Sequence, residues 1–115
     1  MGYTTEFRGE FKLNVPLELD HLIELKSFVD ERHESEDYPS IWCDWVPSED
    51  GSSIAWNGAE KFYNYLEWLE YIITHFLERW DYVLNGEVEW CGEDHWNDRG
   101  TIHVENNVVT VTKTE

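Results

Sequence analysis

The segment CGEDHWNDRG (91–100) holds the densest set of side chains that could do chemistry. Within six residues it carries Glu93, Asp94, His95 and Asp98. The segment is predicted to be a loop between two strands, and hard cations bind to oxygen-rich loops. The spacing, however, matches no EF-hand or other cation loop. Solvated loop carboxylates are therefore the simpler interpretation, and we predict no metal site and no cofactor.

Acid–base or nucleophilic catalysis would need titratable groups brought together in a pocket. The histidines are instead spread over different predicted elements, at positions His21, His33, His75, His95 and His103. Glu87 and Glu89 lie two residues apart on a predicted strand, so they form a charged stripe on its solvated face. No Ser-His-Asp or Cys-His arrangement is recognisable. The sequence therefore favours a protein that is not an enzyme.

The two cysteines, Cys43 and Cys91, lie far apart in the sequence and form no CxxC pair. A disulfide framework would use more cysteines, and a structural zinc site would need four ligands close together. We expect both cysteines to be buried, reduced thiols.

The stretch IWCDWVP (41–47) places two tryptophans three residues apart around a cysteine and an aspartate. Alternation along a short strand would separate two faces, namely Ile41, Cys43 and Trp45 against Trp42, Asp44 and Val46. We expect Trp45 to face the core and Trp42 to be partly exposed beside Asp44. An exposed aromatic ring beside a carboxylate is common at interfaces, because rigid aromatic side chains bind at low entropic cost.

The net charge of −17 is the most unusual bulk property of this chain of 115 residues. Between His33 and Asp98, sixteen acidic residues accompany only Lys61 and Arg79, whereas the first 32 residues carry seven acids and four bases. Such a charge repels nucleic acids and anionic membranes. It either serves solubility alone or steers the protein toward a basic partner.

Hydrophobic periodicity predicts a strand and then a helix at the start of the chain. In EFRGEFKLNVPL (6–17), Phe7, Phe11 and Leu13 alternate with charged side chains, which indicates a half-buried strand that ends before Pro16. Apolar residues at three- and four-residue steps then indicate an amphipathic helix over about residues 18–32. Short strands in SIWCDWVP (40–47) and SIAWNG (53–58) are predicted to form a hairpin.

The segment 57–80 predicts the longest helix. Asn57 and Glu60 match a capping box, and an apolar stripe follows from Phe62 to Trp80. The segments 82–94 and 100–113 have the composition of strands. The second contains Asn106 and Asn107, which suit a two-residue hairpin turn because asparagine tolerates positive φ. This turn would pair Val104 with Val109 and Ile102 with Val111.

These elements predict one α+β domain over residues 1–115. It has a mainly antiparallel sheet of about five to six strands, with one long amphipathic helix and one shorter helix packed on it. No apolar run approaches the roughly 20 residues of a membrane span, and the first residues lack the pattern of a signal peptide. We therefore expect a soluble cytoplasmic protein.

The chain resembles a family of small phage, prophage and bacterial proteins that have no assigned activity. The matching segments are GYTTEFRGEFKLNVPL (2–17), IWCDWVPSEDG (41–51), AWNGAEKFYNYLEWLEYIITHFL (55–77), YVLNGEVEWCGED (82–94) and NNVVTV (106–111). The sequence departs from the family in a short connector after the first helix and in WNGAEKF, where Asp-Gly-Gly is more typical. The resemblance implies a mobile-element setting for some members, in which small acidic proteins often inhibit a host system.

Three functions remain open. The first is an acidic, non-enzymatic interaction protein that inhibits a host factor by occupying a basic, DNA-binding-like surface, without binding nucleic acid or membrane itself. The second is a small-ligand binding domain with an aromatic-lined pocket, and the third is a self-associating accessory protein. The candidate interaction residues are Trp42, Asp44, Glu49, Asp50, Glu67, Glu70, Glu78, Glu93, Asp94, Trp96 and Asp98.

Overall fold

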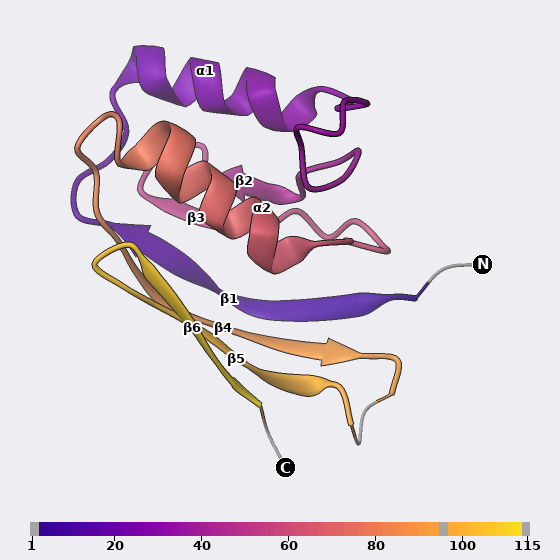
Figure 1. Cartoon of the computed structure of the whole chain (residues 1–115). Coiled ribbons are helices and arrows are strands. Elements are labelled where there is room, and N and C mark those ends of the chain that lie inside the picture. Colours follow the sequence, from indigo (N-terminus) through magenta and orange to yellow (C-terminus); the bar gives the residue numbers. More distant parts are fainter. Residues whose placement is uncertain (1–2, 95–96, 114–115) are drawn as a thin grey trace.

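The computed structural model describes residues 3–94 and 97–113, which form an α+β fold (Figure 1). The described strands are β1 (Thr5–Leu13), β2 (Trp45–Pro47), β3 (Ser53–Trp56), β4 (Leu84–Gly92), β5 (Arg99–Glu105) and β6 (Val108–Lys113). The helices are α1 (Leu19–Asp30) and α2 (Tyr65–Ile72), and α2 continues into a π-helical turn, η1 (Ile73–Leu77). The sheet order is β2-β3-β1-β4-β5-β6, and all neighbours are antiparallel. The predicted fold class is confirmed.

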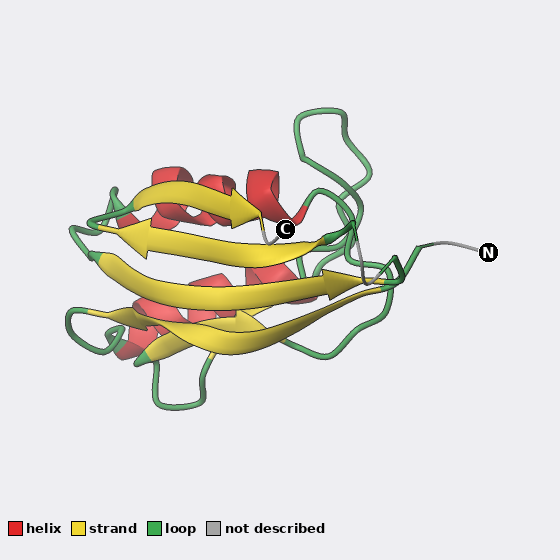
Figure 2. Cartoon of the chain, turned by 90° about the horizontal axis from the view of Figure 1, so that it is seen from below, coloured by secondary structure: helices red, strands yellow, loops and turns green. Residues whose placement is uncertain are grey.

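Both helices lie on one face of the sheet, and no helix of the described residues covers the other face, which we call the bare face (Figures 1 and 2). The alternation in β1 explains this arrangement. Phe7, Phe11 and Leu13 are buried toward the helices, whereas the charged residues between them are exposed. Neither helix of the described chain has the length and apolar character that crossing a membrane would require.

Trp45 lies at the centre of the core, as predicted. Its side chain is fully buried, and its ring packs edge-on against Phe7, Phe11 and Phe62 at centroid distances of 5.2, 5.6 and 5.3 Å. Its Nε1–H donates to the backbone carbonyl of Tyr65 at 2.8 Å, so the buried polar atom has a partner.

The two predicted hairpins are confirmed. Asn106 and Asn107 adopt φ values of 50° and 70°, and the register pairs Val104 with Val109 and Ile102 with Val111. In the other hairpin, β2 pairs with β3. The strand predicted over 40–47 shrinks to the three residues of β2, because the ladder with β3 includes only Trp45–Pro47. The predicted alternation over 41–46 is wrong at two positions, since Ile41 is exposed and Asp44 is buried. It is right for Cys43 and Trp45, which are buried, and for Trp42, which is exposed.

The predicted helix over 57–80 is too long, and the capping box at its start is wrong. The helix begins at Tyr65, and helical structure ends at Leu77. Asn57 instead accepts a hydrogen bond from the Ala59 amide at 2.8 Å. Residues Gly58, Lys61 and Asn64 adopt positive φ values of 90°, 60° and 56°, which an α-helix does not allow. The first predicted helix, over 18–32, is closer to the observed span of Leu19–Asp30.

Candidate binding site

An apolar hollow opens between the connection from α1 to β2 and the connection from β3 to α2. Its volume is about 590 Å³, and we call it the Trp42 pocket; it is lined by Ser40, Ile41, Trp42, Asp44, Ala59, Glu60, Lys61 and Tyr63. Two residues of this set, Trp42 and Asp44, are among those predicted from the sequence. The sequence prediction misses Ala59, Glu60, Lys61 and Tyr63, because it places the segment 57–64 in a helix. It misses Ile41, because it places that residue on the same face as Trp45, and it gives Ser40 no role.

Hydrogen bonds hold the two walls of the Trp42 pocket together, and both connections lie at the same end of the molecule (Figure 1). The Ser40 hydroxyl donates to the backbone carbonyl of Tyr63 at 3.2 Å, and the Asn64 side-chain amide donates to the carbonyl of Pro39. The buried Trp68 on α2 donates its Nε1–H to the Ser40 hydroxyl at 2.7 Å. The pocket is therefore fixed to the core through α2.

The rim of the Trp42 pocket is apolar and exposed. Ile41, Trp42 and Tyr63 keep 43%, 49% and 51% of their surface in solvent. Exposed large apolar side chains that gather in one place commonly mark a binding surface. The prediction that Trp42 is partly exposed is confirmed.

Asp44 lines the same pocket. Among the described residues, it is the only aspartate or glutamate that is buried. Its carboxylate accepts a hydrogen bond from the Asn57 side-chain amide at 3.2 Å. Burial raises the pKa of the Asp44 carboxyl, and the Asn57 hydrogen bond opposes that rise without cancelling it. Glu60 and Lys61 cancel in charge, so Asp44 gives the pocket a net negative charge.

One residue with a strained backbone, Lys61, lines the Trp42 pocket, and Asn64 follows in the same connection. Both adopt left-handed conformations, as do Asp81, Asn106 and Asn107 outside the pocket. Each such residue costs of order 1 kcal/mol or more, and strained residues cluster at functional sites because the surrounding structure must hold them. The strain therefore agrees with a functional role for this wall.

The acidic candidates occupy different parts of the surface. Glu67 and Glu70 on α2 and Glu78 after η1 are exposed, as predicted. Glu49 is exposed in the turn between β2 and β3. Asp50, in the same turn, accepts hydrogen bonds from the hydroxyls of Ser52 and Ser48, both at 2.7 Å. These bonds and the Ser52 amide lower the pKa of Asp50 to about 2, so Asp50 stabilises the turn.

The carboxylates between β4 and β5 accept hydrogen bonds from other groups of the same chain. Asp98 accepts the Nε1–H of Trp90 at 2.9 Å, and Glu93 accepts the Thr4 amide at 2.7 Å. Asp94 accepts the side-chain amide of Asn97. His95 and Trp96 lie outside the described residues. In the part of the chain that the structure describes, no three His, Cys, Asp or Glu side chains are placed to hold a metal ion.

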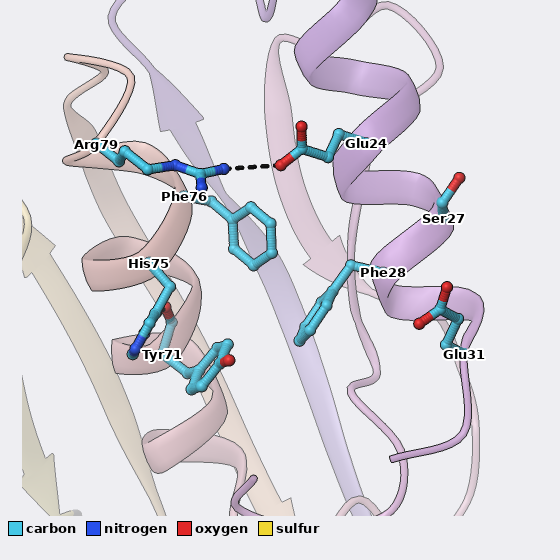
Figure 3. Close-up of a pocket in the computed structure, with 8 residues that line it drawn as sticks. All are labelled: Glu24, Ser27, Phe28, Glu31, Tyr71, His75, Phe76 and Arg79. Atoms are coloured by element: carbon cyan, nitrogen blue, oxygen red, sulfur yellow. Dashed lines mark hydrogen bonds and ion pairs between the residues drawn. The ribbon is translucent and has the colours of Figure 1, made fainter. Parts of the chain in front are cut away.

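A second hollow of about 560 Å³ separates α1 from the end of the second helix (Figure 3). Arg79 reaches across it and donates to Glu24 at 2.7 Å. The Tyr71 ring stacks between Phe28, at 5.5 Å, and His75, at 3.9 Å. These side chains engage one another, so the groove mainly joins the two helices. His75 is exposed.

Comparisons with protein-family profiles, with curated proteins and with solved structures find no match for this chain. The functional argument therefore rests on the geometry of the Trp42 pocket and on the distribution of charge.

Proposed function

We propose that this protein is a non-enzymatic, acidic interaction protein that binds a basic protein partner. In this proposal, a lysine or arginine side chain of the partner enters the Trp42 pocket and pairs with Asp44. The observation that carries the proposal is a buried carboxylate in a hollow whose rim is made of exposed aromatic and aliphatic side chains.

A cationic side chain suits this pocket for two reasons. Burial has already made the negative form of Asp44 costly, as its raised pKa indicates, so a cation that replaces the lost hydration would be favourable. The rings of Trp42 and Tyr63 would attract the same cation through their π faces, which contributes about 0.5–2 kcal/mol. The long apolar stem of lysine or arginine would cover the exposed Ile41.

The charge of the whole chain favours a basic protein over a nucleic acid as the partner. At a net charge of −17 the chain repels phosphate backbones. Glu34, Glu36 and Asp37 are exposed in the connection that leads to Ser40 in the pocket wall. This acidic approach would steer a basic surface toward the Trp42 pocket. This charge distribution and the resemblance to phage proteins support a role as an inhibitor. The protein would inhibit a host factor by occupying the DNA-binding-like surface of that factor.

A second candidate is a small cationic ligand. The pocket volume of about 590 Å³ falls within the range of small-molecule sites. The same Asp44 and the same rings would bind it. The two candidates differ in the role of the exposed acids, because a small ligand does not need them.

Nuclear magnetic resonance titration with short peptides tests the proposal. Acetyl-Gly-Arg-Gly-amide and the lysine analogue should shift the amide signals of residues 40–44 and 59–63, and Asp44→Asn should weaken binding at least about tenfold. The norleucine peptide, which has a similar stem without the charge, is the control. Equal binding of the norleucine peptide, or shifts elsewhere, would contradict a cation site at Asp44.

Capture from a host lysate tests the partner class. Wild type and Trp42→Ala should be compared side by side, because Trp42 is exposed and its loss should leave the fold intact. The proposal would be supported by a basic protein that binds to wild type and not to Trp42→Ala. Added DNA should compete for that protein and release it from wild type. A small molecule that binds at Asp44 with no dependence on Glu34, Glu36 and Asp37 would favour the second candidate.

A further inference from the structure

The two edges of the sheet are protected to very different degrees. The β2 edge is three residues long and ends in Pro47, which cannot donate a backbone hydrogen bond. The β6 edge, VVTVTK over Val108–Lys113, has six residues and no proline. Natural edge strands are usually short, charged, bulged or covered, since a bare edge can pair with another strand. The β6 edge lacks acidic residues although the chain has a net charge of −17.

The β6 edge also exposes apolar side chains on both faces. Val108 keeps 62% of its surface in solvent and Val111 keeps 43%, and the whole strand is exposed or half-buried. On the helix side, Val109 pairs with Val104 and Val111 pairs with Ile102. Both of these β5 partners are buried. The valines of β6 therefore extend the core surface to the edge of the sheet, where the core is incompletely covered.

The hairpin turn determines which backbone groups face outward. A two-residue turn makes Glu105 and Val108 a hydrogen-bonded pair, and such pairs alternate along an antiparallel ladder. The amide and carbonyl groups of Val109, Val111 and Lys113 therefore point away from β5. They form a row of donors and acceptors along the free edge.

We propose that the β6 edge pairs with the β6 edge of a second copy of this chain, antiparallel and about a twofold axis at Thr110. In this register Val109 lies opposite Val111 of the second copy, and Thr110 lies opposite its own counterpart. On the helix side, each row of side chains then runs from Val104 and Val109 of one copy to Val111 and Ile102 of the other. The strand is self-complementary, and no acidic side chain of β6 meets another, which matters when two chains of charge −17 associate.

Disulfide cross-linking tests both the pairing and its register. In a Cys91→Ser background, Thr110→Cys should form a covalent dimer under mild oxidation, because a non-hydrogen-bonded antiparallel pair brings two Cβ atoms within disulfide range. Val108→Cys is the matched control on the same face, and it should not cross-link with itself. A mixture of Val108→Cys with Thr112→Cys should cross-link, since the register places these two positions opposite each other.

Sedimentation velocity gives the second, independent measurement. Wild type should shift from monomer to dimer over a series from about 1 to about 500 µM, and Val111→Glu should raise the dimer dissociation constant at least about tenfold. Circular dichroism checks that this variant stays folded. A chain that stays monomeric throughout, with no Thr110→Cys dimer, would overturn the proposal and leave the edge to a strand of another protein. Trp42→Ala should dimerise normally, because the Trp42 pocket lies beside the opposite sheet edge.

Discussion

At the residue level, the buried charge of Asp44 destabilises the fold, and the proposed binding depends on the same charge. Its carboxyl is buried and its pKa is raised, so the folded protein holds the proton more tightly than the unfolded chain does. The destabilisation is absent at pH values below the unfolded pKa. It grows as the pH rises from the unfolded pKa to the raised pKa of the folded protein, and it is constant above that value.

Asp44→Asn should therefore stabilise the free protein at pH 7. The amide oxygen can still accept the hydrogen bond from Asn57, and the buried negative charge is gone. The difference from wild type should vanish near pH 3, where the wild-type carboxyl is protonated in both states. Urea unfolding at both pH values measures this. Asp50→Asn is the control of opposite sign: the pKa of Asp50 is lowered to about 2, so its loss should destabilise at pH 7, and less as the pH falls toward 2.

The two thiols should differ sharply in reactivity. Cys43 is buried, and burial raises the pKa of its thiol to about 12. Cys91 is only half-buried on the bare sheet face, so the expectation that both are buried is wrong for Cys91. An aromatic disulfide reagent at pH 8 should label Cys91 in the native protein and Cys43 only after unfolding. Rapid native labelling of Cys43 in a Cys91→Ser variant would show that the hairpin region opens.

At the level of elements, β1 and β4 approach closely where a side chain would not fit. Gly9 has a φ of 108°, and a Cβ at this position would lie 2.8 Å from the carbonyl oxygen of Glu87. Gly86 has a φ of 139°, and a Cβ at this position would lie 3.0 Å from the carbonyl oxygen of Glu10 in β1. These strands form the centre of the sheet, so their pairing positions both edges and the helices above them.

Gly9→Ala should destabilise the fold by about 1–3 kcal/mol, through the positive φ and the clash with β4 together. Gly58→Ala is the matched control, because Gly58 also has positive φ, at 90°, but no atom lies within 4 Å of the place that an alanine Cβ would occupy there. It should cost about 1 kcal/mol. Urea unfolding compares the two variants. Equal losses of unfolding free energy would mean that β4 can move away from the new methyl group without a free-energy cost.

The elements with an unbroken period were predictable from the sequence. The alternation of β1 and the Asn106–Asn107 turn depend on local chemistry, so their faces and register were predicted correctly. The start of the second helix was not predictable in this way. Phe62 continues the apolar stripe and is buried, but it is reached from a strained connection rather than a helix. Gly58 and Asn64, both residues that tolerate positive φ, were the signal against an early start.

The candidate site was only partly predictable for the same reason. Trp42 could be chosen because it was placed opposite Trp45 and beside Asp44, and exposed aromatic rings beside carboxylates are common at interfaces. Its neighbours Ile41 and Tyr63 come from two connections whose approach depends on Ser40 and Asn64 hydrogen bonds. Tertiary contacts of this kind leave no periodic trace in a sequence. The burial of Asp44 likewise follows from the packing of the two connections.

At the level of the whole molecule, the direction of the electric field should reveal which face a partner approaches. Glu34, Glu36 and Asp37 are exposed in the connection that leads into the wall of the Trp42 pocket, and the bare sheet face carries the exposed residues Glu6, Glu89 and Glu105. Both sets contain three charges, so reversing either set changes the net charge equally. The sets differ in the part of the fold that carries them, and Glu34 also pairs with Arg32 at 3.0 Å.

Reversal of Glu34, Glu36 and Asp37 to lysine should slow association with a peptide of alternating arginine and glycine about tenfold at about 0.1 M salt. The same reversal on the sheet face should change the rate less than about twofold, because salt screens charges beyond about 10 Å. Stopped-flow measurements over a range of ionic strengths follow both variants. An equal effect of the two sets would show that net charge alone attracts the peptide, and the Trp42 pocket would then have no directed approach.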